Sequence, residues 1–288
     1  MTEKAPAIAV LTSVAPLAAT TDAWISDIWG VLHNGIAAYP DAGAACVRFR
    51  EAGGTVVLVT NAPRPEADVA RMLQRLGIPR GAYDAIMTSG DVSRSLIAEY
   101  PGARLYHLGP ERAAGVLTGL DVRLSGPDEA EVVLCTGLFE DEHEQPDDYR
   151  DELRSLASRK VPLICANPDL VVERGPKLVP CAGALAQIYE EIGGTVLYAG
   201  KPYGPIYERA YAAIRAARGA LPPKDRILAI GDGLRTDVEG AGREGLRCLF
   251  IASALHVDER RAFDSGHVAE IVAGHAHPPA AAMRTLAW

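Results

Sequence analysis

The stretch "AWISDIWGVLHNG", residues 23–35, joins a short apolar run to a glycine turn, with an aspartate between them. Short runs rich in β-branched and aromatic residues, ended by turn residues, are typical of buried strands. We therefore predict a strand over residues 23–29 that carries Asp27 toward its carboxyl end. Two positions later, where a second carboxylate would be useful for acid–base chemistry, the chain has Trp29.

The same pattern recurs along the chain, with helical patterns between the strands. A second strand is predicted over residues 54–60, and an apolar stripe at helical spacing predicts a helix over residues 65–78. Between the first two strands, a helix is expected to end at the pair Gly53-Gly54. Further strands are predicted over residues 195–200, 226–231 and 247–252. Such alternation indicates an α/β fold with a parallel sheet wrapped by helices.

The middle of the chain has an α/β pattern of its own. Strands are predicted over residues 103–109, 131–137 and 161–167, and helices over residues 111–120 and 148–160. The simplest interpretation is a second α/β domain inserted into the first. We expect the core domain to comprise residues 1–98 and 187–288, and the inserted domain to comprise residues 99–186.

Composition narrows the function classes. The 288 residues carry a net charge of -8, whereas a general nucleic-acid binder needs a basic face. No apolar run reaches the ~18 residues of a membrane span, and polar residues and a proline interrupt the apolar N-terminal segment, which argues against a signal peptide. The five cysteines form no C-x-x-C pair, which suits a reducing compartment. We expect a cytoplasmic protein that binds neither nucleic acid nor membrane.

Polar residues cluster where the predicted core strands end. They are Asp27, Thr60, Asn61, Lys201, Asp232 and Asp237. Each alone would be interpreted as a cap, a turn or a surface residue, but ligands of parallel sheets bind at the carboxyl ends of the strands. Three carboxylates at one edge favour a hard cation such as Mg²⁺, and an added ammonium and hydroxyl favour a phosphoryl group. The set indicates phosphoryl transfer, with Asp27 as nucleophile and an aspartyl phosphate that water hydrolyses.

The order of these motifs resembles that of the haloacid dehalogenase superfamily. The motifs are D-x-x-G-V (27–31), T-N (60–61), G-K-P (200–202) and G-D-x-x-x-x-D (231–237). Four longer segments are similar to its class IIA branch, the NagD-like phosphatases: "CANPDLV" (165–171), "PCAGAL" (180–185), "YAGKPYGPIYERA" (198–210) and "GDGLRTDVEGA" (231–241). The resemblance covers roughly residues 22–252. It implies a Rossmann-like core with an α/β cap inserted between the T-N and G-K-P motifs.

The resemblance also implies roles for individual residues. Asp27 would be the nucleophile, and Thr60 and Lys201 would hold the phosphoryl group. The Mg²⁺ ligands would be Asp27, the backbone carbonyl of Trp29, Asp232 and, through water or by bracing the shell, Asp237. For a small phosphorylated substrate such as a sugar or nucleotide monophosphate, the resemblance places Asn167 and Asp169 near the active site. From their places in the sequence alone, Asn61 at a strand end and Arg64 just after it are further expected binding residues, with an ordinary surface cation as the alternative for Arg64. A homodimer is left open, because caps of this family often mediate dimers.

Trp29 departs from the family pattern, which is D-x-D. The second aspartate of that pattern protonates the leaving oxygen and later activates water, whereas an indole N–H is only a donor. Loss of a general acid–base is expected to cost ~10²–10⁴ in rate. Three interpretations stay open: His33 substitutes for the aspartate, the substrate leaves without protonation, or the protein has turned toward binding. Dehalogenation through Asp27 is a rival chemistry, but it needs no Mg²⁺, and Asp232 and Asp237 argue against it.

Overall fold

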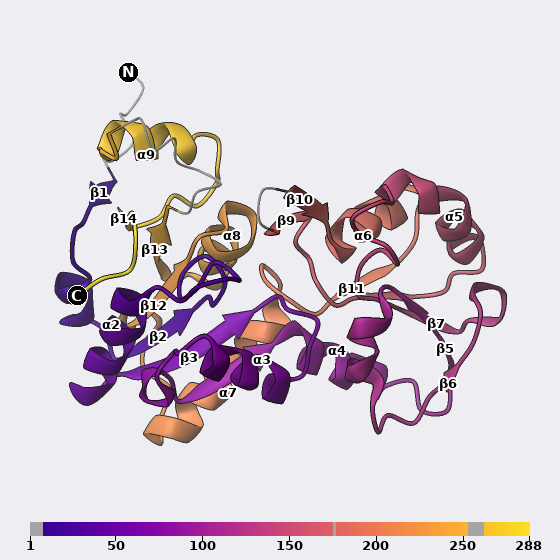
Figure 1. Ribbon diagram of the computed structural model, residues 1–288, viewed down its shortest axis with the longest axis horizontal. Coiled ribbons are helices and arrows are strands. Elements are labelled where there is room, and N and C mark those ends of the chain that lie inside the picture. The colour runs from indigo at the N-terminus through magenta and orange to yellow at the C-terminus, as the bar shows by residue number, and fades with distance from the viewer. Residues whose placement is uncertain (1–7, 175–176, 253–261) are drawn as a thin grey trace. The chain divides into compact units, whose positions relative to one another are not determined.

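A computed structural model describes residues 8–174, 177–252 and 262–288 (Figure 1). The chain divides into two compact units. The first unit comprises the chain up to Val59, Ala70–Ile86 and Tyr207 onward, and the second comprises Thr60–Val69 and Met87–Ile206. We describe each unit by itself.

A seven-stranded sheet forms the centre of the first unit (Figure 1). Its order is β1 (Ala9–Val10), β14 (Ala281–Met283), β13 (Arg247–Ile251), β12 (Ile227–Gly231), β2 (Ala23–Ser26), β3 (Thr55–Thr60) and β4 (Ala85–Thr88). The pairings from β1 to β3 are all parallel. The α/β class with a parallel sheet is therefore confirmed. Strand β2 lies between β12 and β3, with Ser26 opposite Ile230 on one side and Leu58 on the other.

The helices that belong wholly or partly to this unit are α1 (Ala15–Ala18), α2 (Pro40–Glu51), α3 (Glu66–Arg75), α7 (Gly204–Arg218), α8 (Glu239–Glu244) and α9 (Ser265–Ile271). Helix α2 packs on β2, because the ring of Phe49 stacks on that of Trp24 with centroids 3.9 Å apart. The predicted end of α2 at the glycine pair is present. Gly53, at φ +91°, donates to Arg50 and Gly54 donates to Phe49, each at 2.9 Å. This pair of bonds is a Schellman motif, which needs the left-handed backbone that glycine adopts freely.

The second unit has a five-stranded sheet of order β11 (Val196–Tyr198), β8 (Leu163–Cys165), β7 (Val132–Cys135), β5 (Arg104–Leu108) and β6 (Arg123–Leu124). It also has an antiparallel hairpin, β9 (Val171–Arg174) and β10 (Lys177–Pro180). Its helices include α4 (Ser89–Ile97), α5 (Arg150–Ser158) and α6 (Ala182–Glu191). Buried residues of α5 and α6 share one apolar cluster with residues of β5, β7 and β8.

Two features of this unit differ from the sequence-based expectations. Strand β11, which we assigned to the core domain, pairs with β8, so this unit extends beyond the expected insertion of residues 99–186. The helix expected over residues 111–120 is a 3₁₀ segment, Glu111–Leu117. Pro110 caps this segment, while Gly115 and Gly119 lower its helix propensity, which explains why no α-helix forms there.

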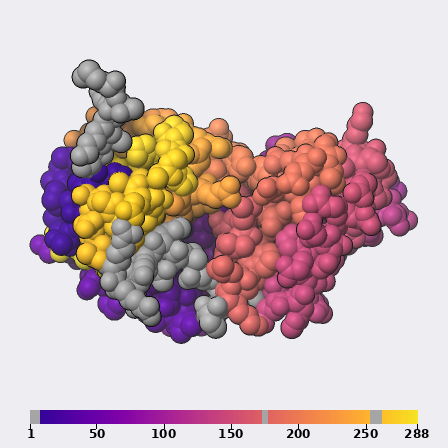
Figure 2. All heavy atoms as spheres, turned by 90° about the horizontal axis from the view of Figure 1, so that it is seen from above, coloured from indigo at the N-terminus to yellow at the C-terminus, as the bar shows by residue number. Residues whose placement is uncertain are grey.

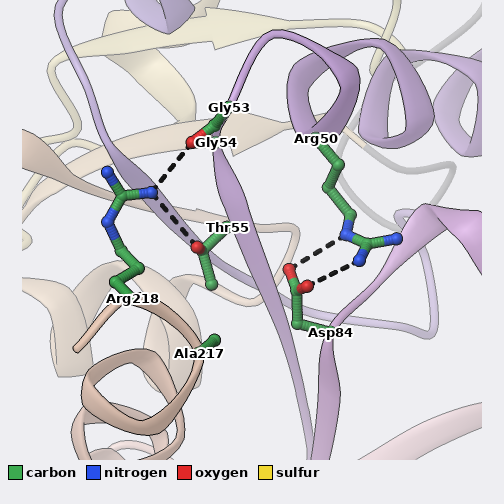
Figure 3. A pocket seen from close by; sticks show the side chains of 7 residues that line it. All are labelled: Arg50, Gly53, Gly54, Thr55, Asp84, Ala217 and Arg218. Carbon is green, nitrogen blue, oxygen red and sulfur yellow. Dashed lines mark hydrogen bonds and ion pairs between the residues drawn. The ribbon is translucent and has the colours of Figure 1, made fainter.

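A cavity of about 380 Å³ lies where β3 begins, at the amino edge of the first unit's sheet (Figure 3). Arg218 donates from Nη1 to the carbonyls of Asp22 and Gly53 and to Thr55 Oγ1, at 2.9, 3.0 and 3.2 Å. Arg50 holds Asp84 through two bonds of 2.9 and 2.6 Å. Both guanidinium groups thus join the ends of helices to the starts of strands. The cavity lies at the sheet edge opposite Asp27.

Asp84→Ala is expected to lower the free energy of unfolding of the first unit by about 1–3 kcal/mol. The substitution leaves two donors without their acceptor: the Arg50 guanidinium and the Val56 N–H, which donates to Asp84 Oδ2 at 2.8 Å. Urea denaturation measures the change. Asp225→Ala removes an exposed carboxylate of the same unit and is expected to change stability by less than about 0.5 kcal/mol. Equal effects of the two substitutions would contradict the structural role of Asp84.

The described N- and C-terminal segments lie side by side, because β1 pairs with β14 (Figure 2). All five cysteine side chains are buried. Among the helices that the structure describes, none combines the length and the apolar character that a membrane crossing requires.

Candidate active site

Three aspartates meet at the carboxyl edge of the first unit's sheet. Asp27 follows β2, Asp232 follows β12, and Asp237 lies in the wide helical turn Leu234–Val238. One carboxylate oxygen from each lies within 4.8 Å of those of the other two. The three residues are only 9, 6 and 4% exposed, respectively. Three buried carboxylates this close concentrate acceptor oxygens at one point, which suits a hard divalent cation.

Backbone hydrogen bonds fix these side chains. Asp27 donates its N–H to the Ile230 carbonyl at 2.7 Å, which continues the pairing of β2 with β12. Its Oδ1 accepts from the N–H of Ile28 at 2.7 Å. Asp237 Oδ2 accepts from the N–H of Gly233 at 3.1 Å. The carboxylates of Asp27 and Asp237 are thus each held by a backbone N–H group.

Two glycines allow the aspartates to approach the backbone. A Cβ atom on Gly30 would overlap the Asp232 carboxylate, and a Cβ atom on Gly231 would overlap Asp237 Cγ. Gly30 also has a φ of +80°, which side chains rarely adopt. These glycines are part of the site, although the sequence motifs alone do not indicate that they contact the aspartates.

Gly30→Ala is expected to weaken Mg²⁺ binding at least ~10-fold, because the new methyl group displaces the Asp232 carboxylate. Isothermal titration calorimetry with Mg²⁺ alone measures this change without reference to catalysis. Gly77→Ala is the matched control: Gly77 has a φ of +82°, with no described atom within 4 Å of the added Cβ. Both substitutions cost similar backbone strain, so equal Mg²⁺ affinities in the two variants would contradict the role of Gly30.

The donor set fits Mg²⁺. This ion binds carboxylate oxygens in an octahedral shell at 2.0–2.1 Å, in which opposite oxygens lie about 4.2 Å apart. The three carboxylate oxygens lie within 4.8 Å of one another, a separation comparable with that between ligands of one such ion. Two carboxylates and one backbone carbonyl, that of Trp29, are the ligands that the family resemblance implies, with Asp237 acting through water or bracing the shell.

The loop after Asp27 shows how Trp29 and His33 lie. The Trp29 side chain is half-buried, and its Nε1 lies 3.2 Å from the position of a Cβ on Gly35, so the indole covers that turn. His33 is 1% exposed, and its Nδ1 accepts from the Gly35 N–H at 2.8 Å. Burial lowers the pKa of His33 to about 4. Its Nε2 is buried and has no hydrogen-bond partner among the residues that the structure describes. This geometry makes His33 a residue that shapes the turn.

The other predicted site residues belong to the second unit. Asn61 is 5% exposed; its side chain bonds to both backbone polar groups of Lys201 and to the Asp169 carboxylate. Lys201 is 3% exposed, and Thr60, whose Oγ1 accepts from the Ala62 N–H at 3.2 Å, is 6% exposed. The structure therefore gathers the predicted residues as two groups, one in each unit.

The remaining two candidates have different surroundings. Asn167 is largely buried, and its Oδ1 accepts from the Asp169 N–H at 3.1 Å, so it shapes the turn that carries Asp169. Arg64 is exposed. A further residue, Ser89, is fully buried, and its Oγ donates to the carbonyl of Asn61 at 3.0 Å. Sequence reasoning missed Ser89 because a serine at the start of a helix has the ordinary interpretation of a cap.

Two protein-family models match the chain. A model of haloacid dehalogenase-like hydrolases matches residues 24–123, and a HAD-hydrolase-like model matches residues 198–274. No curated protein matches the chain. Among solved structures, a hydrolase of the haloacid dehalogenase-like family from Brucella suis 1330 is 46% identical, with a TM-score of 0.84. That match covers 95% of this chain and 98% of the Brucella chain.

More distant structures share the fold. A "possible sugar phosphatase" from Cytophaga hutchinsonii is 22% identical with a TM-score of 0.76, over 96% of this chain and 97% of that one. A p-nitrophenyl phosphatase from Archaeoglobus fulgidus is 19% identical with a TM-score of 0.70, over 92% and 96% of the two chains. The resemblance that the sequence motifs indicated is confirmed by the family models and by the Brucella structure: the chain belongs to the haloacid dehalogenase-like hydrolase family.

Proposed function

We propose that the protein is a Mg²⁺-dependent phosphatase that hydrolyses small phosphate monoesters through a phosphorylated Asp27. The observation that carries this proposal is the group of three buried carboxylates whose oxygens lie within 4.8 Å of one another where β2 and β12 end. Two proteins that share the fold, the possible sugar phosphatase from Cytophaga hutchinsonii and the p-nitrophenyl phosphatase from Archaeoglobus fulgidus, support the substrate class.

The reaction has two displacements at phosphorus. In the first, an Asp27 oxygen bonds to phosphorus, and the bond from phosphorus to the substrate oxygen breaks with the electron pair staying on that oxygen. In the second, water bonds to phosphorus and the Asp27–phosphorus bond breaks, which releases inorganic phosphate and regenerates the carboxylate.

Charge neutralisation allows an anionic carboxylate to approach an anionic phosphate. Lys201 supplies a positive charge and Thr60 a hydrogen-bond donor for the phosphoryl oxygens, whose charge must be stabilised in the transition state. Asp27, Asp232 and the Trp29 carbonyl would hold Mg²⁺, with Asp237 acting through water or bracing the shell, and the ion would supply a second positive charge at the phosphoryl group.

Trp29 limits the leaving groups that the enzyme accepts. The indole N–H donates hydrogen bonds but does not act as a general acid, so the leaving oxygen departs without receiving a proton from residue 29. His33 does not offer an accessible replacement, since it is buried and its Nδ1 is occupied by the Gly35 N–H. We infer a preference for aryl or acyl phosphates over alkyl phosphates.

A second candidate is a binding protein that keeps the carboxylate site and its metal but hydrolyses substrate negligibly. The observation that favours it is Trp29 in the position of the second aspartate. The buried carboxylates argue for catalysis, since binding alone does not require a nucleophile beside a metal site. We further propose a cytoplasmic location, because the five buried cysteines suit a reducing compartment.

The test is a hydrolysis screen over aryl, acyl, sugar and nucleotide monophosphates, with and without Mg²⁺. We expect turnover that requires Mg²⁺ and stops on chelation, with aryl and acyl phosphates hydrolysed fastest. Binding of a phosphate ester without turnover, with an affinity that Asp27→Asn leaves unchanged, would support the binding protein instead.

A further inference from the structure

We propose that Asn61 is a positioning residue, whose side-chain amide fixes the backbone of Lys201 and thereby sets where the Lys201 ammonium lies. The inference rests on the proposed function, because it deepens the part that Lys201 has in it. All residues in the argument belong to the second unit, so their contacts are internal to that unit.

The amide of Asn61 matches the backbone of Lys201 group by group. The N–H of Lys201 donates to Asn61 Oδ1 at 2.7 Å, and Asn61 Nδ2 donates to the carbonyl of Lys201 at 3.1 Å. A carboxamide carries an acceptor and a donor side by side, whereas a carboxylate carries two acceptors and a hydroxyl is too short to bridge both groups. Both residues are almost fully buried, so water does not compete for these bonds.

Asp169 fixes which way the amide faces. Asn61 Nδ2 donates its second hydrogen to Asp169 Oδ1 at 3.1 Å. A flipped amide would turn its oxygen toward the Asp169 carboxylate and its NH₂ toward the Lys201 N–H, which loses three bonds at once. Asp169 is itself held by the turn in which its N–H donates to Asn167 Oδ1. The "NPD" turn therefore supports the contact between Asn61 and Lys201.

The contact between Asn61 and the backbone before Lys201 is closely packed. A Cβ atom on Gly200 would overlap Asn61 Oδ1 and would lie 2.7 Å from Pro168 Cδ, so only glycine allows the close approach. Ser89 Oγ donates to the carbonyls of Asn61 and Ala166, which ties the backbone at residue 61 to the strand end before the "NPD" turn. Asn61 is thus fixed through both its backbone and its side chain.

The consequence concerns the proposed phosphate contacts. Thr60 directly precedes Asn61, and Lys201 is bonded to the Asn61 side chain, although 140 residues separate the two segments. One rigid network therefore carries both the hydroxyl and the ammonium that would hold the phosphoryl group. A misplacement of about 1 Å at such a group costs on the order of 10²-fold in rate.

Asn61→Asp in the full-length protein tests this role. The carboxylate keeps an acceptor for the Lys201 N–H but turns an oxygen toward the Lys201 carbonyl and toward Asp169. We expect kcat/KM for p-nitrophenyl phosphate to fall ~10- to 100-fold, mainly through kcat. Asn34→Asp is the matched control, because Asn34 is exposed and its Oδ1 accepts from the N–H groups of Ile36 and Ala37 at 3.0 and 2.8 Å, bonds that a carboxylate also accepts. That variant is expected to stay within about 2-fold of the wild type.

A double-mutant cycle separates positioning from simple packing. In Asn61→Asp combined with Asp169→Asn, the second substitution removes the repulsion and supplies an amide that donates to the new carboxylate. We expect this pair to recover at least ~5-fold of the activity lost in Asn61→Asp, and not all of it, because the Lys201 carbonyl still faces an oxygen. No recovery, or an Asn61→Asp variant as active as the wild type, would overturn the positioning role.

Hydrogen exchange gives a readout that does not depend on activity. In Asn61→Ala, which buries no new charge and serves where Asn61→Asp does not fold, the Lys201 amide is expected to exchange ~10-fold faster than in the wild type. Unchanged exchange of the Lys201 amide overturns the positioning role of Asn61 even if activity falls. If the wild type hydrolyses no phosphate ester but the Lys201 amide still exchanges faster in Asn61→Ala than in the wild type, the proposed function is wrong and the positioning role of Asn61 stands. The two failures are therefore distinguishable.

Discussion

Asp27→Asn is expected to lower the turnover of every phosphate ester that the wild type hydrolyses by on the order of 10³-fold or more. A carboxamide has the size of a carboxylate but is a poor nucleophile toward phosphorus, so the phosphorylated intermediate no longer forms. Steady-state kinetics with p-nitrophenyl phosphate measures the loss. Trapping with radiolabelled substrate should show a covalent phosphate on the wild type and none on the variant.

The fold is expected to survive this change. Asparagine retains an oxygen that accepts from the Ile28 N–H at 2.7 Å, and the bond from residue 27 to the Ile230 carbonyl involves only backbone. Loss of one of three neighbouring buried carboxylates also relieves repulsion, so the metal-free variant should be at least as stable as the metal-free wild type. Thermal unfolding of both proteins in the presence of a chelator measures whether the variant is at least as stable as the wild type.

Asp232→Asn is the informative comparison. It keeps the nucleophile and removes a metal ligand, so higher Mg²⁺ concentrations should recover part of its activity, whereas they should recover none in Asp27→Asn. If Asp27→Asn remains active, a different group attacks phosphorus, and the role given to Asp27 is wrong.

The sequence was sufficient for the central strands and insufficient for the edges. Strands β2, β3, β12 and β13 are fully buried or nearly so, and their apolar runs predicted them within a few residues. Strand β2 ends at Ser26, earlier than predicted, because the apolar residues that follow belong to a turn in which Gly30 has a positive φ. Strands β1 and β14 have two and three residues, which is too few for a periodic sequence pattern. They are defined by their pairing with neighbouring strands.

The same division applies to the candidate site. The residue types at the strand ends predicted a cluster of carboxylates, since parallel strands bring their carboxyl ends to one edge. The contact between Asn61 and Lys201 had no such signal. It depends on the orientation of one amide against a backbone segment 140 residues away, which spacing within a motif does not encode. The assignment of β11 to the second unit likewise depends on its pairing with β8, a long-range choice.

Trp29→Asp is expected to raise the hydrolysis rate of alkyl phosphates by ~10²–10⁴, and that of aryl phosphates far less. A carboxylic acid at position 29 protonates a poor leaving oxygen, whereas a good leaving group needs no proton. The wild type should therefore show a steep dependence of rate on the acidity of the leaving alcohol or phenol, and the variant a shallow one. A series of aryl and alkyl phosphates, each measured at saturating Mg²⁺, gives both slopes.

Trp29→Asn decides what such a gain means. It removes the indole from above Gly35 to the same extent as aspartate does, and it keeps the backbone carbonyl, but it transfers no proton. If the aspartate variant alone gains activity on alkyl phosphates, the site lacks only a general acid, and Trp29 selects substrates that leave unaided. If both variants gain equally, the indole acts by occupying space over the turn. If neither variant gains activity, proton transfer does not limit the reaction. If the wild type is also inactive on every ester, the protein is a binding protein.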